Sequence, residues 1–361
     1  MPPPTGEAAR VLEALRNVRE PELERDLVAL QMIKELEVSD SSVSLTVALA
    51  TPASPFRAEI EQGIREQLSK LGIREVRLSW ETAIPQARGP SDKPAMPGVK
   101  NIVAIGSGKG GVGKTTVAVN LAVGLSAMKA AVGLLDADVY GPNVPLMVGA
   151  SGQPKAFGDR IQPLEQYGLR LMSMGFLNPG DKPVIWRGPM LHGIMQQFLK
   201  NVDWGELDYL VIDLPPGTGD VALSLIQTVP VTGAVVVTTP SDVSLDDARK
   251  AVEMFRQVKV EVLGVVENMS YLVCPHCRER VDVFGYGGGR RTAERYGVPF
   301  LGELPLHPEV RIGGDTGLPV VLRGEQDPLA RAFLEMDRRV AARLSILNLT
   351  APAESILHVK M

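Results

Sequence analysis

The chain has 361 residues and a net charge of −4, with 45% of its residues hydrophobic and 22% charged. This composition is ordinary for a soluble globular protein of two or three domains, and it gives no overall basic character that would favour a nucleic-acid partner. The two cysteines do not make a disulfide framework, the N-terminus has no secretory signal pattern, and no apolar run approaches the roughly 20 residues of a membrane span. We therefore expect a cytoplasmic protein that has neither a membrane nor a nucleic acid as its partner.

Residues 1–84 are predicted to form a small α/β domain. Apolar residues alternate with smaller or polar ones over 43–49, as in a half-buried strand. An apolar stripe that repeats every four residues over 56–68 predicts a helix, and 73–80 is typical of a closing strand. Residues 85–98 are rich in proline, glycine and charge, which predicts an interdomain linker.

Residues 99–346 are predicted to form a second, larger α/β domain. Short apolar runs alternate with helical stretches, which favours a doubly wound, mostly parallel sheet with its ligands at the carboxyl ends of the strands. The amphipathic helix expected over 327–346 either closes this domain against its core or lies on a membrane surface. Residues 347–361 are left as a C-terminal tail. The candidate strands of the sheet are 101–105, 131–136, 209–213, 233–239 and 260–267.

A glycine-rich loop over 106–116 follows the first of these strands and precedes a predicted helix, as a phosphate-binding loop does. Its backbone N–H groups and the positive end of the helix dipole would bind an anion. We expect Lys114 to reach the β- and γ-phosphates of a nucleotide and the Thr115 hydroxyl to bind Mg²⁺. The predicted nucleotide-binding residues of the loop are Gly108, Lys109, Gly110, Gly111, Val112, Gly113, Lys114, Thr115 and Thr116.

Acidic residues end the second and third predicted strands. Asp136 and Asp138 follow the second strand, where one carboxylate can order the Mg²⁺ shell and the other can orient an attacking water. The third strand ends at Asp213, in the form of a Walker-B strand whose aspartate holds Mg²⁺. The loop after it is a plausible switch, with the Gly217 N–H sensing the γ-phosphate.

Lys109 is a second lysine in a loop that already has Lys114. It can bind the phosphates of its own nucleotide or of a partner's, and a solvated loop lysine is an equally good interpretation from chemistry alone. We assign Lys109, Asp138 and Lys114 to catalysis of ATP hydrolysis.

Cys274 and Cys277 form a Cys-x-x-Cys pair, which lets two thiolates grip one metal centre. Three interpretations stay open at this point. The pair is half of a site shared by a dimer, where four thiolates suit a [4Fe–4S] cluster or a tetrahedral Zn²⁺, or it is a redox dithiol, or it binds no ligand. The redox interpretation expects a helix after the motif, whereas residues 278–284 look like a turn and a short strand.

The loop sequence Gly-Lys-Gly-Gly-Val-Gly-Lys-Thr resembles the deviant Walker A motif of the nitrogenase iron protein and MinD class of ATPases. Within that class the chain resembles the Mrp/ApbC family over about 99–322, on the strength of five further segments. These are Asp136-Ala137-Asp138-Val139-Tyr140-Gly141-Pro142, Trp186-Arg187-Gly188-Pro189-Met190, Asp213-Leu214-Pro215-Pro216-Gly217-Thr218-Gly219-Asp220, Cys274-Pro275-His276-Cys277 and Phe284-Gly285-Tyr286-Gly287-Gly288-Gly289.

The resemblance implies an ATP-binding iron–sulfur cluster carrier. It implies a homodimer that holds a [4Fe–4S] cluster on Cys274 and Cys277, a cluster donor and apoprotein recipients, and slow ATP hydrolysis coupled to transfer. It also implies that Lys109 reaches the partner's phosphates and that Asn268 contacts adenine. We add the hypothesis that nucleotide state controls cluster loading or release.

The N-terminal domain resembles the MIP-type iron–sulfur assembly domain through Arg19-Glu20-Pro21-Glu22-Leu23 and Ala50-Thr51-Pro52-Ala53-Ser54-Pro55. It departs from that pattern at Glu20, where the family has aspartate, and at Ser54, where the family has cysteine. A serine hydroxyl is a poor iron ligand at neutral pH, so the expected role is docking or regulation, and a purely structural role is equally open.

Two rival functions remain. The first is a MinD- or ParA-like partition or membrane-surface ATPase, and the second is a zinc-bridged dimeric ATPase. The cysteine pair distinguishes the first rival from a cluster carrier, because a partition ATPase does not need it. The roles of Arg187, His192 and Asp315 are open and include structural ones.

Overall fold

The computed structural model describes residues 6–21, 25–39, 42–52, 54, 56–87, 96–139, 141–177 and 188–350. Most of the predicted linker (85–98) and of the predicted tail (347–361) lies outside them, as do Arg187 and the side chain of His192. Two compact units emerge, one of Met1–Arg88 with Ala341–Met361 and one of Gly89–Val340. The domain boundaries drawn from the sequence stay predictions.

The first unit has a three-stranded sheet of order β3-β4-β5, in which β3 pairs antiparallel and β5 parallel with β4. Helix α2 connects β4 to β5, as a parallel pair requires. The apolar stripe predicted over 56–68 is buried at Ile60, Ile64 and Leu68, and it packs on the alternating residues of β4. The elements before residue 88 are α1 (Glu7–Leu15), β1 (Arg19–Glu20), β2 (Arg25–Asp26), β3 (Ile33–Ser39), β4 (Ser42–Leu49), α2 (Arg57–Ser69) and β5 (Glu75–Thr82).

Residues from the end of the chain complete this first unit. The Ser345 hydroxyl donates to the Ala50 carbonyl over 2.7 Å, and the Asn348 amide donates to the Pro85 carbonyl over 3.2 Å. Both come from α10 (Pro328–Thr350), the helix expected over 327–346. The unit is therefore discontinuous in the sequence.

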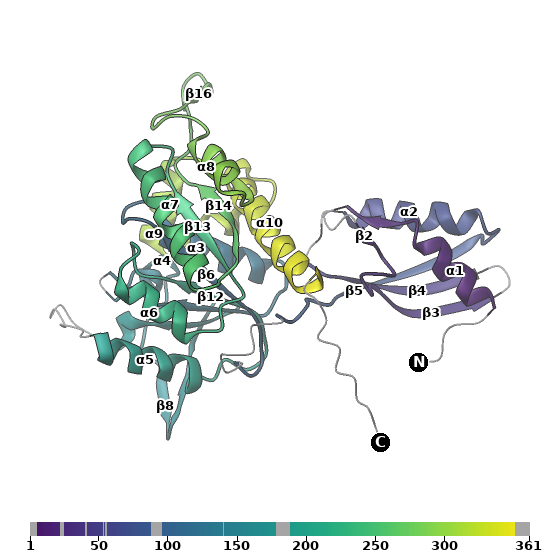
Figure 1. The fold of residues 1–361 in the computed structure, drawn as a ribbon, viewed down its shortest axis with the longest axis horizontal. Helices are drawn as coiled ribbons and strands as arrows, with labels where there is room; N and C mark the ends of the chain where they lie inside the picture. Colours follow the sequence, from purple (N-terminus) through teal and green to yellow (C-terminus); the bar gives the residue numbers. More distant parts are fainter. Residues whose placement is uncertain are drawn as a thin grey trace. The chain divides into compact units, whose positions relative to one another are not determined.

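The second unit is built on a sheet whose strands β6, β12, β13 and β14 are labelled in Figure 1. Among the described residues this sheet has eight strands, in the order β10-β11-β7-β12-β6-β13-β14-β17. All neighbours are parallel except β10 and β11. The five strands predicted from the sequence are all present. The strands of this unit are β6 (Val99–Ser107), β7 (Val132–Asp136), β8 (Lys155–Phe157), β9 (Arg160–Gln162), β10 (Leu164–Gln166), β11 (Leu169–Ser173), β12 (Leu207–Asp213), β13 (Gly233–Thr238), β14 (Val262–Glu267), β15 (Leu272–Val273), β16 (Arg280–Val281) and β17 (Phe300–Glu303).

Helices cover both faces of this sheet. One apolar core joins alternate sheet residues to α5, α6, α7 and α8, and α3 packs on β6, β7 and β12 with the other set of sheet side chains. This is the doubly wound arrangement expected from strands that are apolar on both faces. The other elements are α3 (Lys114–Ala127), α4 (Val144–Met147), η1 (Met174–Leu177), α5 (Gly188–Lys200), α6 (Asp220–Thr228), α7 (Asp242–Gln257), α8 (Gly288–Tyr296), α9 (Pro308–Thr316), η2 (Val320–Arg323) and α10.

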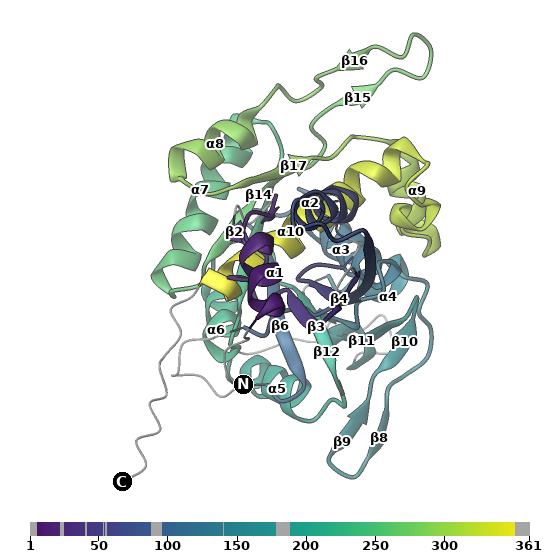
Figure 2. The ribbon, with the colours of Figure 1, turned by 90° about the vertical axis from the view of Figure 1, so that its right-hand side faces the viewer.

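Two features of the second unit extend from the sheet as hairpins. The β8–β9 hairpin lies near β10, and the β15–β16 hairpin projects from the segment between β14 and α8 (Figure 2). The second of these carries the two cysteines. Across the described residues, no helix combines the length and the apolar character that crossing a bilayer demands.

Candidate functional site

The phosphate-binding loop lies at the carboxyl end of β6, the strand between β12 and β13 in the sheet. Gly113 is the N-cap of α3, and its φ of 79° lies in the left-handed region that glycine adopts without strain. The N-terminal turn of α3 and the loop border a cavity of about 560 Å³. The loop residues that line it are Ser107, Lys109, Gly110, Gly111, Gly113, Lys114, Thr115 and Thr116.

Gly108 and Val112 of the predicted loop do not line the cavity. Gly108 packs against the backbone of Asp247, where a side chain has no room. Val112 is buried, and its carbonyl accepts a hydrogen bond of 2.9 Å from the Asn268 amide. Asn268 itself lines the cavity, so its side chain is in a suitable position for the predicted contact with adenine. That contact stays a prediction.

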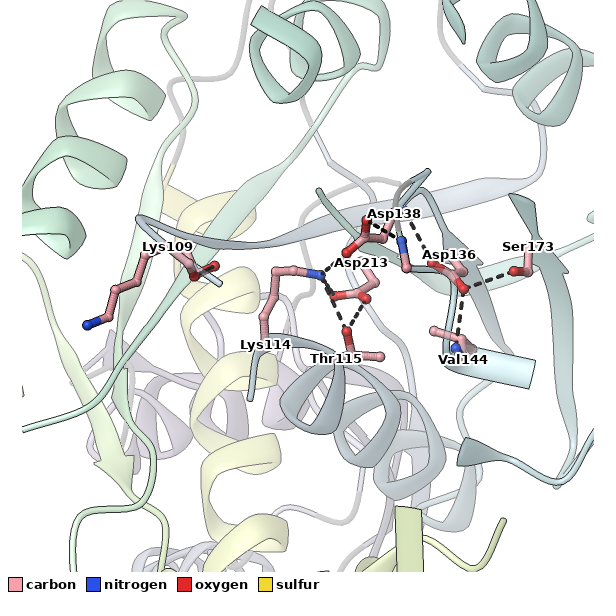
Figure 3. A network of polar contacts seen from close by, with 10 residues as sticks. Lys109, Lys114, Thr115, Asp136, Asp138, Val144, Ser173 and Asp213 are labelled. Carbon is pink, nitrogen blue, oxygen red and sulfur yellow. Dashed lines mark hydrogen bonds and ion pairs between the residues drawn. The ribbon is translucent and has the colours of Figure 1, made fainter. Parts of the chain in front are cut away.

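Lys114 is held inside a group of carboxylates (Figure 3). Its ammonium lies 2.6 Å from Asp213 Oδ1 and 3.9 Å from Asp138 Oδ2. The Thr115 hydroxyl donates to Asp213 Oδ2 over 2.7 Å. Lys109 extends in another direction, away from this group (Figure 3). The structure thus brings together the two residues predicted to hold Mg²⁺, with Lys114 beside them.

Burial governs the ionisation of the two aspartates that end β7 and β12. Burial raises the pKa of Asp213, more than the adjacent Lys114 ammonium and the Thr115 hydroxyl lower it. Burial, followed by the charge of Asp213, raises the pKa of Asp136 to about 7, against the hydrogen bonds that it accepts. A cation that enters this group would favour the ionised form of both carboxylates.

Asp136 holds the loop that follows β7 and does not line the cavity. Its Oδ1 accepts from the Asp138 N–H over 3.1 Å, and its Oδ2 accepts from the Ser173 hydroxyl over 2.9 Å and the Val144 N–H over 3.2 Å. Asp138 does line the cavity. The Mg²⁺ contact assigned to Asp136 stays a prediction, and the contacts within the chain support a second task, that of positioning Asp138.

Gly217, predicted to sense a γ-phosphate, has a φ of 86° and donates its N–H to the Ser107 carbonyl over 3.1 Å. Pro216, which lies between Pro215 and Gly217 in the loop, lines the cavity. A contact between the Gly217 N–H and a phosphate would therefore have to replace the bond to Ser107.

Sequence reasoning missed the wall of the cavity that follows β17. This wall comprises Pro305, Leu306, His307, Val310, Arg311, Gly314 and Asp315. His307 caps α9 by accepting the Glu309 N–H at Nδ1, and Asp315, whose role was left open, forms an ion pair with Arg311. The signal that could have found them is the short apolar run Phe300–Leu301, which precedes a glycine and an acid.

Cys274 and Cys277 are free thiols on the β15–β16 hairpin, the first partly exposed and the second exposed. The Arg278 N–H donates to the Cys274 carbonyl, and the Cys274 N–H donates to the Glu279 carbonyl, both over 2.9 Å. Backbone N–H groups of Cys277 and then His276, followed by the Cys277 thiol, lower the pKa of Cys274. The turn followed by a short strand, β16, is as predicted.

The hairpin is anchored at its base by Arg280. This guanidinium donates to Asp282 over 2.8 Å and to Glu303 over 3.0 Å. It also lies over two aromatic rings, 4.4 Å from the centroid of Tyr271 and 5.0 Å from that of Tyr286. The cysteines therefore stand on a hairpin whose base is fixed and whose tip is exposed.

Comparison with known proteins identifies both parts of the chain. The family described as NUBPL iron-transfer P-loop NTPase matches residues 98–341, and the family described as iron–sulfur cluster assembly protein matches residues 8–77. An iron–sulfur cluster carrier protein of Deinococcus radiodurans is 49% identical over 96% of this chain and 98% of its own length.

Solved structures agree with the fold. A nucleotide-binding protein of Archaeoglobus fulgidus, solved in complex with ADP, has a TM-score of 0.58 at 37% identity, over 66% of this chain and 93% of its own. The cell division ATPase MinD of Pyrococcus furiosus has a TM-score of 0.51 at 24% identity, over 66% of this chain and 98% of its own, which supports the fold alone. The chain thus belongs to the NUBPL-type iron-transfer P-loop NTPases with an N-terminal iron–sulfur cluster assembly domain, which confirms its resemblance to the Mrp/ApbC iron–sulfur cluster carriers.

Proposed function

We propose that this protein binds ATP in the cavity beside Lys114 and carries an iron–sulfur cluster on Cys274 and Cys277, which it delivers to apoproteins. The observation that carries the proposal is the pair of free cysteines, one partly exposed and one exposed, on a hairpin of a nucleotide-binding domain. A partition ATPase has no use for such a pair. The family and the names of its relatives supply independent support.

The nucleotide part of the proposal rests on the loop and its carboxylates. The N–H groups at the start of α3 can donate hydrogen bonds to the phosphates. Lys114 can replace its contact with Asp213 by a contact with a phosphate oxygen without leaving the cavity. The Thr115 hydroxyl and the Asp213 carboxylate are hard oxygen donors that lie side by side, so they fit Mg²⁺. When bound, Mg²⁺ would neutralise charge on the β- and γ-phosphates.

Hydrolysis of ATP is assigned to Asp138, Lys114 and Lys109. The Asp138 carboxylate lines the cavity and would orient the attacking water. Lys109 also lines the cavity, yet its side chain points away from Lys114 and Asp213. That direction favours a contact with the nucleotide of a second copy over one with its own. We expect hydrolysis to be slow and coupled to cluster transfer.

The cluster part of the proposal requires a homodimer. One chain offers two thiolates, and two copies related by a twofold axis offer the four that a [4Fe–4S] cluster takes. Apolar side chains exposed on and beside the hairpin suit burial against another protein surface. They are Val273, Val281, Val283, Phe284 and Tyr286.

The N-terminal unit is assigned to docking or regulation. Ser54 accepts a hydrogen bond of 3.3 Å from the Phe56 N–H, at the start of α2, and the sequence has no cysteine in this unit. Thiolates for a cluster are therefore missing from it.

A cytoplasmic location suits the proposal, since reducing conditions keep Cys274 and Cys277 free.

Anaerobic reconstitution with iron and sulfide tests the function. We expect a visible absorbance shoulder, about half a cluster per chain, and transfer to an apoprotein acceptor. Zinc in the purified protein, together with failure to assemble a cluster, would instead support the zinc-bridged dimer. ATP binding is measured separately by calorimetry, so that the two parts of the proposal can fail independently.

A further inference from the structure

The cysteine hairpin leaves and rejoins the second unit at one buried carboxylate. Glu267 is the last residue of β14, and its side chain is 0% exposed. Its Oε1 accepts from the Ser270 hydroxyl over 2.6 Å, and its Oε2 accepts from the Gly289 N–H. Ser270 comes just before the hairpin, and Gly289 is in the first turn of α8, just after it. The residues just before and just after the hairpin therefore bind the same side chain.

The sequence around α8 is adapted to this contact. A Cβ at Gly289 would lie 2.9 Å from the Cβ of Glu267, so only glycine lets the N–H approach the carboxylate. The positive end of the α8 dipole favours a negative charge there. One function of the glycine run 287–289 is thus to seat the end of the hairpin on Glu267.

The backbone ties the same place to the nucleotide cavity. The Leu304 N–H donates to the Glu267 carbonyl over 2.8 Å, and the Ser270 N–H donates to the Leu304 carbonyl over 2.9 Å. Two residues on, the Leu306 N–H donates to the Tyr271 carbonyl over 2.7 Å, and Leu306 lines the cavity. The segment that leads into the hairpin is therefore hydrogen-bonded to a wall of the nucleotide site.

Asn268, the neighbour of Glu267, contacts the phosphate-binding loop directly. Its amide donates to the Val112 carbonyl over 2.9 Å, and it fills the space that a side chain at Gly113 would need. A shift of the loop on nucleotide binding must displace Asn268, and Glu267 is one peptide away. The chain of contacts runs without a gap from the loop to the hairpin.

We propose that Glu267 is a positioning residue that couples nucleotide occupancy to the placement of Cys274 and Cys277. This inference rests on the proposed function, because it needs a nucleotide in the cavity and a role for the cysteines. In thermodynamic terms, Glu267 carries the coupling free energy between the two sites. It touches neither the nucleotide nor the cluster, so its loss should uncouple the sites without abolishing either one.

The test follows thiol reactivity in the cluster-free full chain. Alkylation of Cys274 and Cys277 by iodoacetamide is timed by mass spectrometry without nucleotide, with Mg-ADP, and with a non-hydrolysable Mg-ATP analogue. We expect nucleotide to change the wild-type rate by about fivefold or more, which is the lower end of the usual range of coupling between sites. In Glu267→Ala the rate should no longer respond, while the affinity for nucleotide by calorimetry stays within about threefold of wild type.

Two variants and one control complete the design. Glu267→Gln should retain the response, because its amide oxygen can accept from Gly289 and its amide nitrogen can donate to Ser270. Ser270→Ala removes one contact only and should weaken the response, and it stands in if Glu267→Ala does not fold by circular dichroism. Glu294→Ala removes an exposed carboxylate from the same helix, α8, and should respond as wild type does.

A nucleotide response that survives in Glu267→Ala, or that is undiminished in Ser270→Ala if that variant is needed, overturns the inference. The inference is also overturned if the wild-type protein binds nucleotide and assembles a cluster but its alkylation rate does not change with nucleotide. In that case the proposed function stands. If the wild-type protein binds no nucleotide or assembles no cluster, the proposed function itself has failed, and the inference falls with it.

Discussion

Lys114 Nζ lies 2.6 Å from Asp213 Oδ1, and both side chains are buried. The ammonium and the Thr115 hydroxyl occupy both oxygens of this carboxylate. Under the proposed function, binding of Mg-nucleotide would therefore exchange partners within a preformed group. Lys114 would turn from Asp213 to a phosphate, and the carboxylate would become available to the cation.

Replacement of Lys114 tests this exchange. Lys114→Ala should weaken ATP binding by about tenfold or more, since a hydrogen bond to a charged group contributes about 1.5–3 kcal/mol. It should also lower the unfolding temperature, because Asp213 stays buried without its cation. The double variant Lys114→Ala/Asp213→Asn should recover stability but not affinity. Calorimetry and thermal melts measure the two effects, and ATP affinity within twofold of wild type would contradict the assignment.

Replacement of Lys109 tests its predicted action on a second copy. Lys109→Ala should leave the affinity of the monomer for ADP within about threefold of wild type, because the side chain points away from the phosphate-binding group. It should lower the ATPase kcat by about tenfold or more, the loss expected for a charged group that acts on the transition state. Lys109→Arg keeps the charge and should retain part of the rate. ADP binding that falls as far as it does in Lys114→Ala would show that Lys109 acts on its own nucleotide.

Replacement of the cysteines tests the cluster site. Cys274→Ser and Cys277→Ser should each abolish the absorbance of the reconstituted cluster, because serine is a poor iron ligand. The unfolding temperature of the cluster-free protein should change little, since the turn is held by backbone hydrogen bonds. His276→Ala, in the same exposed turn, is the matched control and should retain the cluster. Full iron and sulfide content in either serine variant would remove these cysteines from the site.

Asp337 gives the stability of the second unit a pH dependence. Its carboxylate oxygens have no hydrogen-bond partner among the described residues, and burial, opposed by the charge of Arg338, raises its pKa well above 3.8. A raised folded-state pKa favours the protonated form, so its contribution to stability is lost as pH rises from about 4 through the folded pKa. The unfolding temperature of Asp337→Asn relative to wild type should therefore increase with pH.

Asp327, which immediately precedes the same helix, supplies the control for this measurement. Burial acts to raise its pKa, but the N–H groups of Ala330 and Leu329, followed by the Arg323 guanidinium, together outweigh burial and lower the pKa. Its stabilisation is present above pH of about 4 and is lost below, so Asp327→Asn should show the opposite trend. Thermal melts from about pH 2 to 8 cover both windows, and a difference for Asp337→Asn that is constant over this range would rule out the role of Asp337.

The sequence predicts the centre of the sheet better than its edges. The five inner strands are continuous apolar runs, since both of their faces are covered by helices. Strand β11 was missed because Arg170 interrupts its pattern, where the guanidinium donates to the Trp204 carbonyl. Strand β17 is four residues long and contains a glycine and an acid. Without β17, the cavity wall from Pro305 onward could not be anticipated.

Spacing within the chain predicts which residues approach the nucleotide site but not how they pair. The positions of Lys114, Thr115 and Asp213 follow from the order of strand, loop and helix. The hydrogen bonds from Ser173 to Asp136 and from Gly289 to Glu267 join residues 37 and 22 positions apart. The pairing of β11 with β7 brings the first pair together, and the packing of α8 on β14 brings the second together. A buried acid at the end of an apolar strand is the signal for both.

The first unit takes residues from both ends of the chain, which has a consequence for its synthesis. The Ala50 and Pro85 carbonyls emerge from the ribosome before Ser345 and Asn348, which donate to them and follow 295 and 263 residues later. Domains that are continuous in sequence can finish folding while translation proceeds. In this unit the two hydrogen bonds cannot form until residues 345–348 have been made, so a protein terminated before them would carry an unfinished N-terminal domain, however well its nucleotide domain had folded.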